Sequence, residues 1–219
     1  MLMIERALGP HKKMNLYQPA PIDPTMSIKD TTNNLIVLKE AAAARTCDAR
    51  ADKIIRRGDC GGQVYPATAA EIEVSLWAYK LEVKKVIDTA RELNISVFAY
   101  SPLGKGFIGG KFSSASELPA GDYRTRFARF KDNTLAHNMS LVSALPELAA
   151  KKRVTPAQLA IAWVAALGPH VIPLPGSSTA PQTLENSEAV EIELSAEMAG
   201  EGCPRDRMTG GADEGYLWG

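Results

Sequence analysis

The chain has 219 residues, of which 45% are apolar and 23% charged, the balance of an ordinary soluble globular protein. Its 25 basic and 25 acidic side chains cancel and are spread without long single-sign blocks. Neither nucleic acid nor an anionic membrane is therefore expected as a partner, and a small molecule is.

The sequence carries no sign of membrane insertion, secretion or a metal centre. No stretch approaches the roughly 20 apolar residues of a membrane-spanning helix, and Glu5 interrupts the short apolar run at the N-terminus. Cys47, Cys60 and Cys203 have unrelated spacings and no histidine pair nearby. We therefore expect a cytoplasmic protein without a metal site or a disulfide framework.

The first third of the chain begins with the pattern of a strand, a loop and a helix. A short apolar run ending at Leu16-Tyr17 leads into a proline-rich loop, and Ser27 then has the character of a helix N-cap. Residues 45–64 differ, because they hold eight charged residues, three glycines and two cysteines, and no strand pattern can be read there. Residues 45–64 are thus an anomalous segment.

From residue 72 onward, short strands alternate with helices, as is typical of a parallel α/β sheet or barrel. The expected strands are 72–76, 97–100 and 171–174. The expected helices are 81–93, 140–152, 155–167 and 182–189. Thr155-Pro156 is typical of an N-cap followed by proline at the first helical position. The glycine-rich tail, 200–219, is expected to be disordered.

Two loops rich in small residues follow predicted strands and are the candidate ligand sites. The first is 101–106, Ser-Pro-Leu-Gly-Lys-Gly, and the second is 176–179, Gly-Ser-Ser-Thr. In a parallel barrel, ligands bind where the strands end, and small residues let backbone amides approach an anion. Taken alone, either loop is better explained by a tight turn that binds nothing, so order and flanking residues carry the argument.

The flanking residues resemble those of a known family. Residues 97–107, Val-Phe-Ala-Tyr-Ser-Pro-Leu-Gly-Lys-Gly-Phe, resemble the AYSPLGRGFLTGK signature of the aldo-keto reductases. Further segments match in the family order: 16–20, 71–77, 154–163, 172–176 and 184–186. The resemblance is to the fungal pyridoxal-reductase-like branch and covers about 5–40 and 72–198.

The resemblance implies an α/β fold, a (β/α)8 TIM barrel that binds NADPH at the strand ends and reduces aldehydes or ketones to alcohols. This chain resembles the C-terminal two-thirds of such a barrel. We therefore expect 1–219 to be one incomplete domain that lacks the first three or so strand-helix units. The small-molecule partner would be a carbonyl substrate, and the oligomeric state stays open.

The first loop is implied to hold the nicotinamide and the pyrophosphate. Tyr100 would stack its ring on the nicotinamide; the alternative is an ordinary core aromatic. Lys105 would supply charge near the pyrophosphate, and the residues implied to line it are Ser101, Leu103 and Gly104. Glu71 stands where the family has a glutamine that holds the nicotinamide carboxamide. A carboxylate can accept from that amide but cannot donate to its carbonyl.

The second loop is implied to hold the adenosine phosphate. The matching residues are Gly176, Ser177, Ser178 and Thr179. The family often has Lys or Arg here, whereas this loop offers only hydroxyls, so the preference for NADP over NAD is weakened and NADH is possible. The positions matching adenosine contacts are Gln182, Glu185 and Asn186, for which an ordinary polar helix face is the alternative.

The family's catalytic Asp, Tyr and Lys have no counterpart in this chain, and Ala20 aligns with the family histidine. Three interpretations stay open: a reductase seen in part, a non-catalytic nucleotide-binding degenerate reductase, or a truncated gene-model fragment. Spacing is preserved between residues 24 and 75 although the pattern is lost in 45–64. This suggests a shifted reading frame or a misplaced exon boundary.

Overall fold

The computed structural model describes residues 68–195 and, outside that range, Leu16–Tyr17, Thr25, Asp30, Thr46–Cys47 and Met198. Its contacts divide the chain into two compact units. The first comprises Met1–Ile72 and Lys84–Phe98, and the second comprises Glu73–Val83 and Ala99–Gly219.

A two-stranded parallel ladder lies in the first unit. Strand β1 (Leu16–Tyr17) places its residues beside Thr46 and Cys47 of strand β2 (Thr46–Cys47). No strand pattern can be read in 45–64, yet β2 lies near its start, because a two-residue strand is too short to show alternation. The rest of 45–64, the N-cap at Ser27 and the tail 200–219 lie outside the described residues.

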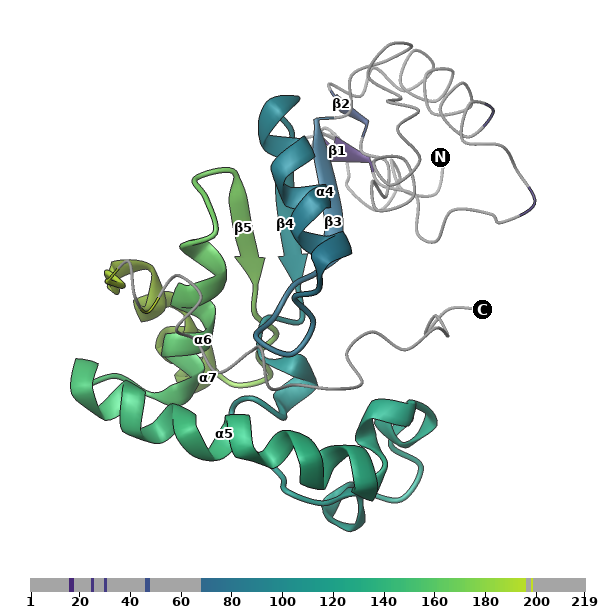
Figure 1. Cartoon of the computed structure of the whole chain (residues 1–219), viewed down its shortest axis with the longest axis vertical. Helices are drawn as coiled ribbons and strands as arrows, with labels where there is room; N and C mark the ends of the chain where they lie inside the picture. Colours follow the sequence, from purple (N-terminus) through teal and green to yellow (C-terminus); the bar gives the residue numbers. More distant parts are fainter. Residues whose placement is uncertain are drawn as a thin grey trace. The chain divides into compact units, whose positions relative to one another are not determined.

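The second sheet has three strands in the order β3 (Ala69–Glu73), β4 (Ser96–Tyr100) and β5 (Val171–Leu174). The Ser96 N–H donates to Thr68 O and the Val74 N–H donates to Tyr100 O, both at 3.2 Å, so β3 and β4 are parallel. Figure 1 shows β4 and β5 pointing the same way. The predicted parallel α/β arrangement is therefore present in these strands.

Strand β3 begins and ends three residues earlier than the alternation at 72–76 predicts. The Ser75 hydroxyl ends it by accepting the N–H groups of Trp77 at 3.2 Å and Ala78 at 3.0 Å, a local turn that competes with the sheet ladder. Val74 and Leu76 are nevertheless buried. The alternating apolar residues are thus buried as expected, but Ser75 between them is buried too, and β3 ends before all three.

Helix α4 (Leu81–Glu92) connects β3 to β4, close to the predicted 81–93. Its buried residues, Val86, Ile87 and Ala90, recur at helical spacing on one face. Asn94 adopts φ 55° after the last turn, and the Ile95 N–H donates to Ala90 O at 2.8 Å, which satisfies a terminal carbonyl.

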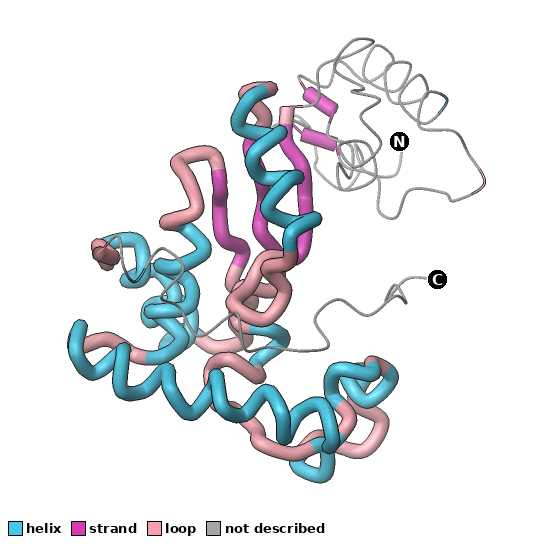
Figure 2. Tube along the Cα trace, in the orientation of Figure 1, coloured by secondary structure: helices cyan, strands magenta, loops and turns pink. Residues whose placement is uncertain are grey.

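Three further helices belong to the second unit: α5 (Asp132–Lys152), α6 (Pro156–Ala165) and α7 (Ala180–Glu188). Helix α5 starts eight residues before the predicted 140, because its first turns bury Leu135 and the amide of Asn138 rather than an apolar stripe. The predicted cap of α6 is confirmed, with Thr155 as N-cap and Pro156 at the first helical position. In Figure 2 the helices are cyan, and the long α5 runs along the lower part of the view.

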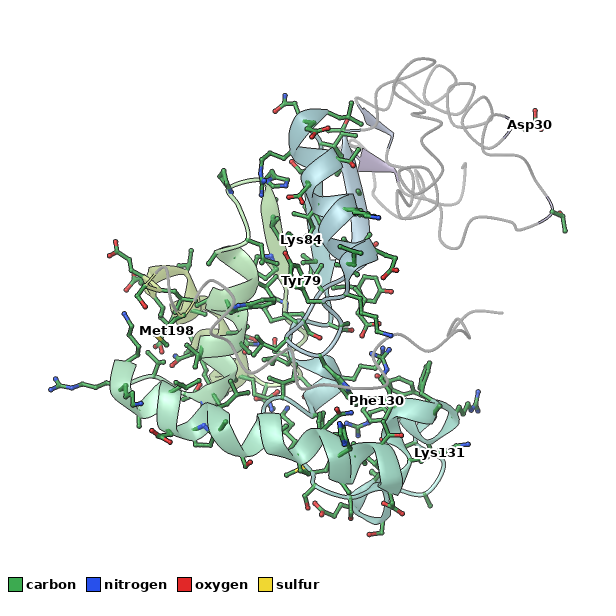
Figure 3. All side chains as sticks on the ribbon, in the orientation of Figure 1. Asp30, Tyr79, Lys84, Phe130, Lys131 and Met198 are labelled. Atoms are coloured by element: carbon green, nitrogen blue, oxygen red, sulfur yellow. The ribbon has the colours of Figure 1, made fainter. Side chains whose placement is uncertain are left out.

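Residues 101–131 form an irregular segment with four short 3-10 turns, η2 (Gly104–Gly106), η3 (Ala115–Glu117), η4 (Tyr123–Arg126) and η5 (Ala128–Phe130). A fifth, η6 (Ala189–Glu191), follows α7. The irregular segment packs through aromatic rings: Trp77 lies 4.6 Å from Phe107 and 5.3 Å from Phe130, centroid to centroid. Figure 3 shows Phe130 and Lys131 beside the start of α5.

Candidate functional site

The loop that follows β4 has a defined and unusual backbone. Ser101, Gly104 and Lys105 have φ values of 55°, 55° and 57°, and Gly106 has 96°. The Gly104 N–H donates to Ser101 O at 2.9 Å and the Gly106 N–H donates to Leu103 O at 3.0 Å. Left-handed conformations at Ser101 and Lys105 cost energy and persist only where the surroundings hold them. The surrounding residues therefore hold this loop in a defined backbone conformation.

Lys105 is held at both its side chain and its backbone. Its Nζ lies 3.5 Å from Glu73 Oε1 and 5.2 Å from the centroid of the Phe127 ring, and the side chain is only 6% exposed. The Lys105 carbonyl accepts a hydrogen bond from Arg124 Nη1 at 2.9 Å. The charge that the sequence analysis assigned to a pyrophosphate thus lies against a carboxylate of the protein.

Glu73 is shared between two cations. Arg129 donates from Nη1 to Glu73 Oε1 at 2.7 Å and from Nη2 to Oε2 at 2.9 Å, a bidentate pair. The Arg129 side chain is 3% exposed and lies 5.6 Å from the centroid of the Trp77 ring. Removing one member of such a buried pair leaves the other without a counter-charge, which is strongly destabilising.

Sequence reasoning did not single out Glu73 or Arg129. The available signals were weak: Glu73 is the acidic residue between the buried Ile72 and Val74, and Arg129 is enclosed in the basic-aromatic run 124–131. The two residues are 56 positions apart, and sequence periodicity does not predict which acidic and basic side chains pair over such a distance.

Arg124 is itself fixed by Asp122. Its Nε donates to Asp122 Oδ1 at 3.0 Å and its Nη2 donates to Oδ2 at 2.7 Å. The hydrogen bonds from the Arg124 side chain, and then from its backbone N–H, hold the pKa of the Asp122 carboxyl below its usual 3.8. The same side-chain hydrogen bonds raise the pKa of the Arg124 guanidinium. Both groups are therefore charged throughout the neutral range.

The second loop lies between β5 and the first turn of α7 and is exposed from residue 176 to residue 181. Thr179 is the N-cap of α7, and Gln182 reaches back to accept the Ser178 N–H at 3.2 Å. The hydroxyls of Ser177 and Thr183 are 2.8 Å apart. A Cβ added at Gly176 would meet nothing within 4 Å, so space is open beside this loop.

Helix α7 is attached to α6 through Gln158. The Gln158 Nε2 donates to Glu188 Oε2 at 2.8 Å and to Glu185 O at 3.2 Å, while its Oε1 accepts the Thr155 N–H at 3.0 Å. Glu185 and Asn186 are half-buried on α7. The position of α7, which carries three of the predicted adenosine contacts, is thus fixed from its neighbour.

Twelve of the thirteen residues predicted to bind cofactor belong to the second unit, in or after β4 and after β5. Tyr100 is the half-buried last residue of β4. The two loops follow neighbouring strands that point the same way. Glu71 lies in the part of β3 that belongs to the first unit. The roles of these residues at a cofactor remain predictions.

The described residues offer neither a metal site nor a membrane-spanning helix. Among the residues that the structure describes, no group of three or more His, Cys, Asp or Glu side chains could hold a metal ion. Within 68–195 and the isolated described positions, no helix is long and apolar enough to cross a membrane.

Comparison with known proteins assigns the chain to a family. The model of the aldo/keto reductase family matches residues 11–201, and the chain belongs to that family. It is 34% identical over 134 residues to the aldo-keto reductase yakc (NADP+) of Schizosaccharomyces pombe, covering 60% of this chain and 39% of the relative. It is 33% identical over 185 residues to the probable aldo-keto reductase 1 of Glycine max, covering 83% and 52%.

Solved structures agree on the fold. The glycerol dehydrogenase of Gluconobacter oxydans superposes with a TM-score of 0.73 at 19% identity, covering 94% of this chain and 62% of that one. A thermostable aldo-keto reductase, Tm1743, crystallised with the inhibitor epalrestat, gives 0.61 at 17% identity, covering 85% and 58%. The α/β fold of the aldo-keto reductases is thus confirmed. The chain spans about half or less of the length of the two curated relatives that it matches.

Proposed function

We propose that this chain supplies the dinucleotide-binding part of an NAD(P)H-dependent oxidoreductase that reduces aldehydes or ketones to alcohols. The observation that carries the proposal is the pair of loops, 101–106 and 176–179, that follow the neighbouring strands β4 and β5 in a member of this family. Ligands of parallel α/β folds bind at the carboxyl ends of the strands, where both loops lie.

The residues present fit such a cofactor. The exposed hydroxyls of Ser177 and Ser178, the open space at Gly176 and the N-terminus of α7 suit an adenosine phosphate. A bound NAD(P)H supplies the hydride. The chain's own part would be to stack the ring of Tyr100 on the nicotinamide and to line the pyrophosphate with the backbone of 101–106.

We also propose that the protein belongs to the fungal pyridoxal-reductase-like branch and forms an incomplete barrel. Within the branch, this chain is expected to discriminate poorly between the two dinucleotides. Residues 175–188 contain no Lys or Arg, so a 2′-phosphate would be held by hydroxyls without a cationic partner.

Titration of the purified chain with NADPH and NADH, followed by nucleotide fluorescence, tests the proposal. We expect saturable binding of both, with affinities within about tenfold of each other because no charge-assisted contact separates them. A folded, cooperatively melting preparation that binds neither dinucleotide would overturn the proposal. Binding without turnover of any aldehyde or ketone would favour the non-catalytic alternative instead.

A matched pair of variants sharpens this test. Ser178→Arg places a guanidinium in the second loop and should favour NADPH over NADH by about tenfold, the value of one charge-assisted hydrogen bond. Ser187→Arg adds the same charge on the exposed far turn of α7 and should leave the ratio unchanged. Equal effects of the two variants would show that 176–179 does not meet the 2′-phosphate.

A further inference from the structure

The Lys105 side chain is buried beside a carboxylate, although a lysine in a glycine-rich loop is expected to be exposed. Its side chain is 6% exposed and its Nζ lies 3.5 Å from Glu73 Oε1, beneath the cover of the Phe127 ring. We propose that Lys105 is a positioning residue that pins the loop 101–106 in its dinucleotide-binding form, and that it is not itself a phosphate ligand. This inference rests on the proposed function.

The side chain of Lys105 is held firmly because its partner, the Glu73 carboxylate, is itself fixed. Glu73 is the last residue of β3, and both its oxygens are engaged by the guanidinium of Arg129, at 2.7 and 2.9 Å. Arg129 is 3% exposed and lies against the rings of Trp77 and Phe130. Lys105 could reach a phosphate only by leaving a carboxylate that is fixed in place.

The backbone of Lys105 is held by a residue of a different element, η4. Arg124 donates to the Lys105 carbonyl at 2.9 Å and is itself held in a bidentate pair by Asp122. The peptide between these two attachments has a left-handed conformation, with φ 57° at Lys105. We call these five residues the Lys105 clamp: Glu73, Lys105, Asp122, Arg124 and Arg129.

The clamp acts on the free protein, before any ligand is present. A loop that is already ordered loses less conformational entropy on binding, so its backbone amides bind an anion more tightly than those of a mobile loop. The clamp also prevents Lys105 from being a flexible counter-ion. The two roles for Lys105, anchor and phosphate ligand, therefore predict opposite results when Glu73 loses its charge.

The test measures NADPH affinity and its salt dependence in the full chain. As an anchor, Lys105→Met should weaken binding by about three- to tenfold, the cost of ordering a loop segment on binding, and Lys105→Arg should restore most of it. The slope of log Kd against log salt should stay that of the wild type. Lys111→Met removes an exposed lysine from the same loop region and should have little effect.

The variant Glu73→Gln should change NADPH affinity in opposite directions for the two roles of Lys105, loop anchor and phosphate ligand. For an anchor, Glu73→Gln weakens binding because it releases Lys105, besides losing the Arg129 pair. Adding Lys105→Met to Glu73→Gln should then weaken binding less than Lys105→Met does in the wild type, because the Lys105 interaction is already lost. For a phosphate ligand, Glu73→Gln releases a competing carboxylate, binding tightens and the salt slope falls in Lys105→Met. The second pattern would overturn the inference.

Hydrogen exchange without nucleotide tests the clamp separately from the proposed function. Amides in the loop 101–106 should exchange faster in Lys105→Met and in Asp122→Asn, which loosens the backbone end, while amides of α4 and α6 should not change. Unchanged loop protection in both variants would overturn the clamp. Faster exchange in a chain that binds neither dinucleotide would keep the clamp and reject the proposed function.

Discussion

Gly104 is the position in the first loop where both backbone and packing demand glycine. Its φ is 55°, and an added Cβ would lie 3.2 Å from Trp77 Cε3 and from two side-chain carbons of Ile108. Gly110 has a similar φ of 69°, with nothing within 4 Å of an added Cβ. Substitution of Gly110 therefore tests the cost of the left-handed backbone alone, whereas substitution of Gly104 adds the cost of crowding.

Gly104→Ala should destabilise the protein by about 2–3 kcal/mol, which sums the left-handed penalty and overpacking against Trp77. Gly110→Ala should cost only about 1 kcal/mol, the backbone term alone. Urea unfolding monitored by circular dichroism measures both free energies of unfolding. Equal losses in the two variants would mean that Trp77 and Ile108 do not crowd Gly104.

The ion pair of Asp122 with Arg124 should give the stability a dependence on acid pH. The folded pKa of Asp122 lies below its usual 3.8, so the pair stabilises the protein fully above about that pH. The stabilisation is lost as the pH falls through the lowered folded value. Asp122→Asn should therefore destabilise the protein at pH 7, and this penalty should shrink as the pH is lowered below about 3.8, as measured by urea midpoints. A penalty that is independent of pH would contradict this origin.

At the residue scale, the sequence singles out the loop 101–106 as a candidate site but does not predict the contacts that hold it. The run 101–106 was singled out from its small residues and its place after a strand. The contacts of Lys105 with Glu73 and Arg124 were not, because ion pairs between distant residues leave no periodic trace. The implied phosphate-binding role of Lys105 followed from its neighbours in sequence, whereas its structural partners come from other segments.

At the scale of elements, the prediction succeeded where a local signal sets the boundary. Strand β5 and the start of α6 were placed to the residue, since an apolar run and a Thr-Pro cap are local features. Strand β3 and helix α5 were misplaced at their ends. Ser75 ends β3 by a side-chain turn, and Asn138 replaces an apolar residue on the buried face of α5.

The cap of α6 should contribute measurably to stability. Thr155 Oγ1 accepts the Gln158 N–H at 3.1 Å and Gln158 Oε1 accepts the Thr155 N–H at 3.0 Å, a complete capping box. Thr155→Ala should cost about 1 kcal/mol of unfolding free energy, and Thr155→Ser much less. Thr179→Ala is the matched comparison on exposed α7, where the equivalent bond is 3.4 Å, and it should cost less. A larger loss at Thr179 would contradict this ranking.

At the scale of the whole molecule, the second unit exposes large apolar side chains on β5, α7 and η6. Strand β5 is the last strand in the described order β3-β4-β5 and carries the exposed Ile172 and Leu174. Leu184 on α7 is 64% exposed and Val190 in η6 is 83% exposed. Exposed large apolar side chains favour association.

We therefore expect this chain, expressed alone, to be poorly soluble or to self-associate as its concentration rises. Sedimentation velocity over a range of concentrations measures this. The double variant Leu184→Glu and Val190→Lys should shift the distribution toward the monomer, whereas two polar changes on the exposed face of α4, Lys84→Glu and Lys85→Glu, should not. A monodisperse wild-type monomer that melts cooperatively would contradict the expectation.

The buried pair of Glu73 with Arg129 has a consequence for folding kinetics. It joins residues 56 positions apart, so the entropy of closing a long segment opposes its formation until α4 and β4 are in place. Contacts that form after the transition state govern the rate of unfolding and leave the rate of folding almost untouched. We therefore expect loss of the pair to speed unfolding of the chain much more than it slows folding.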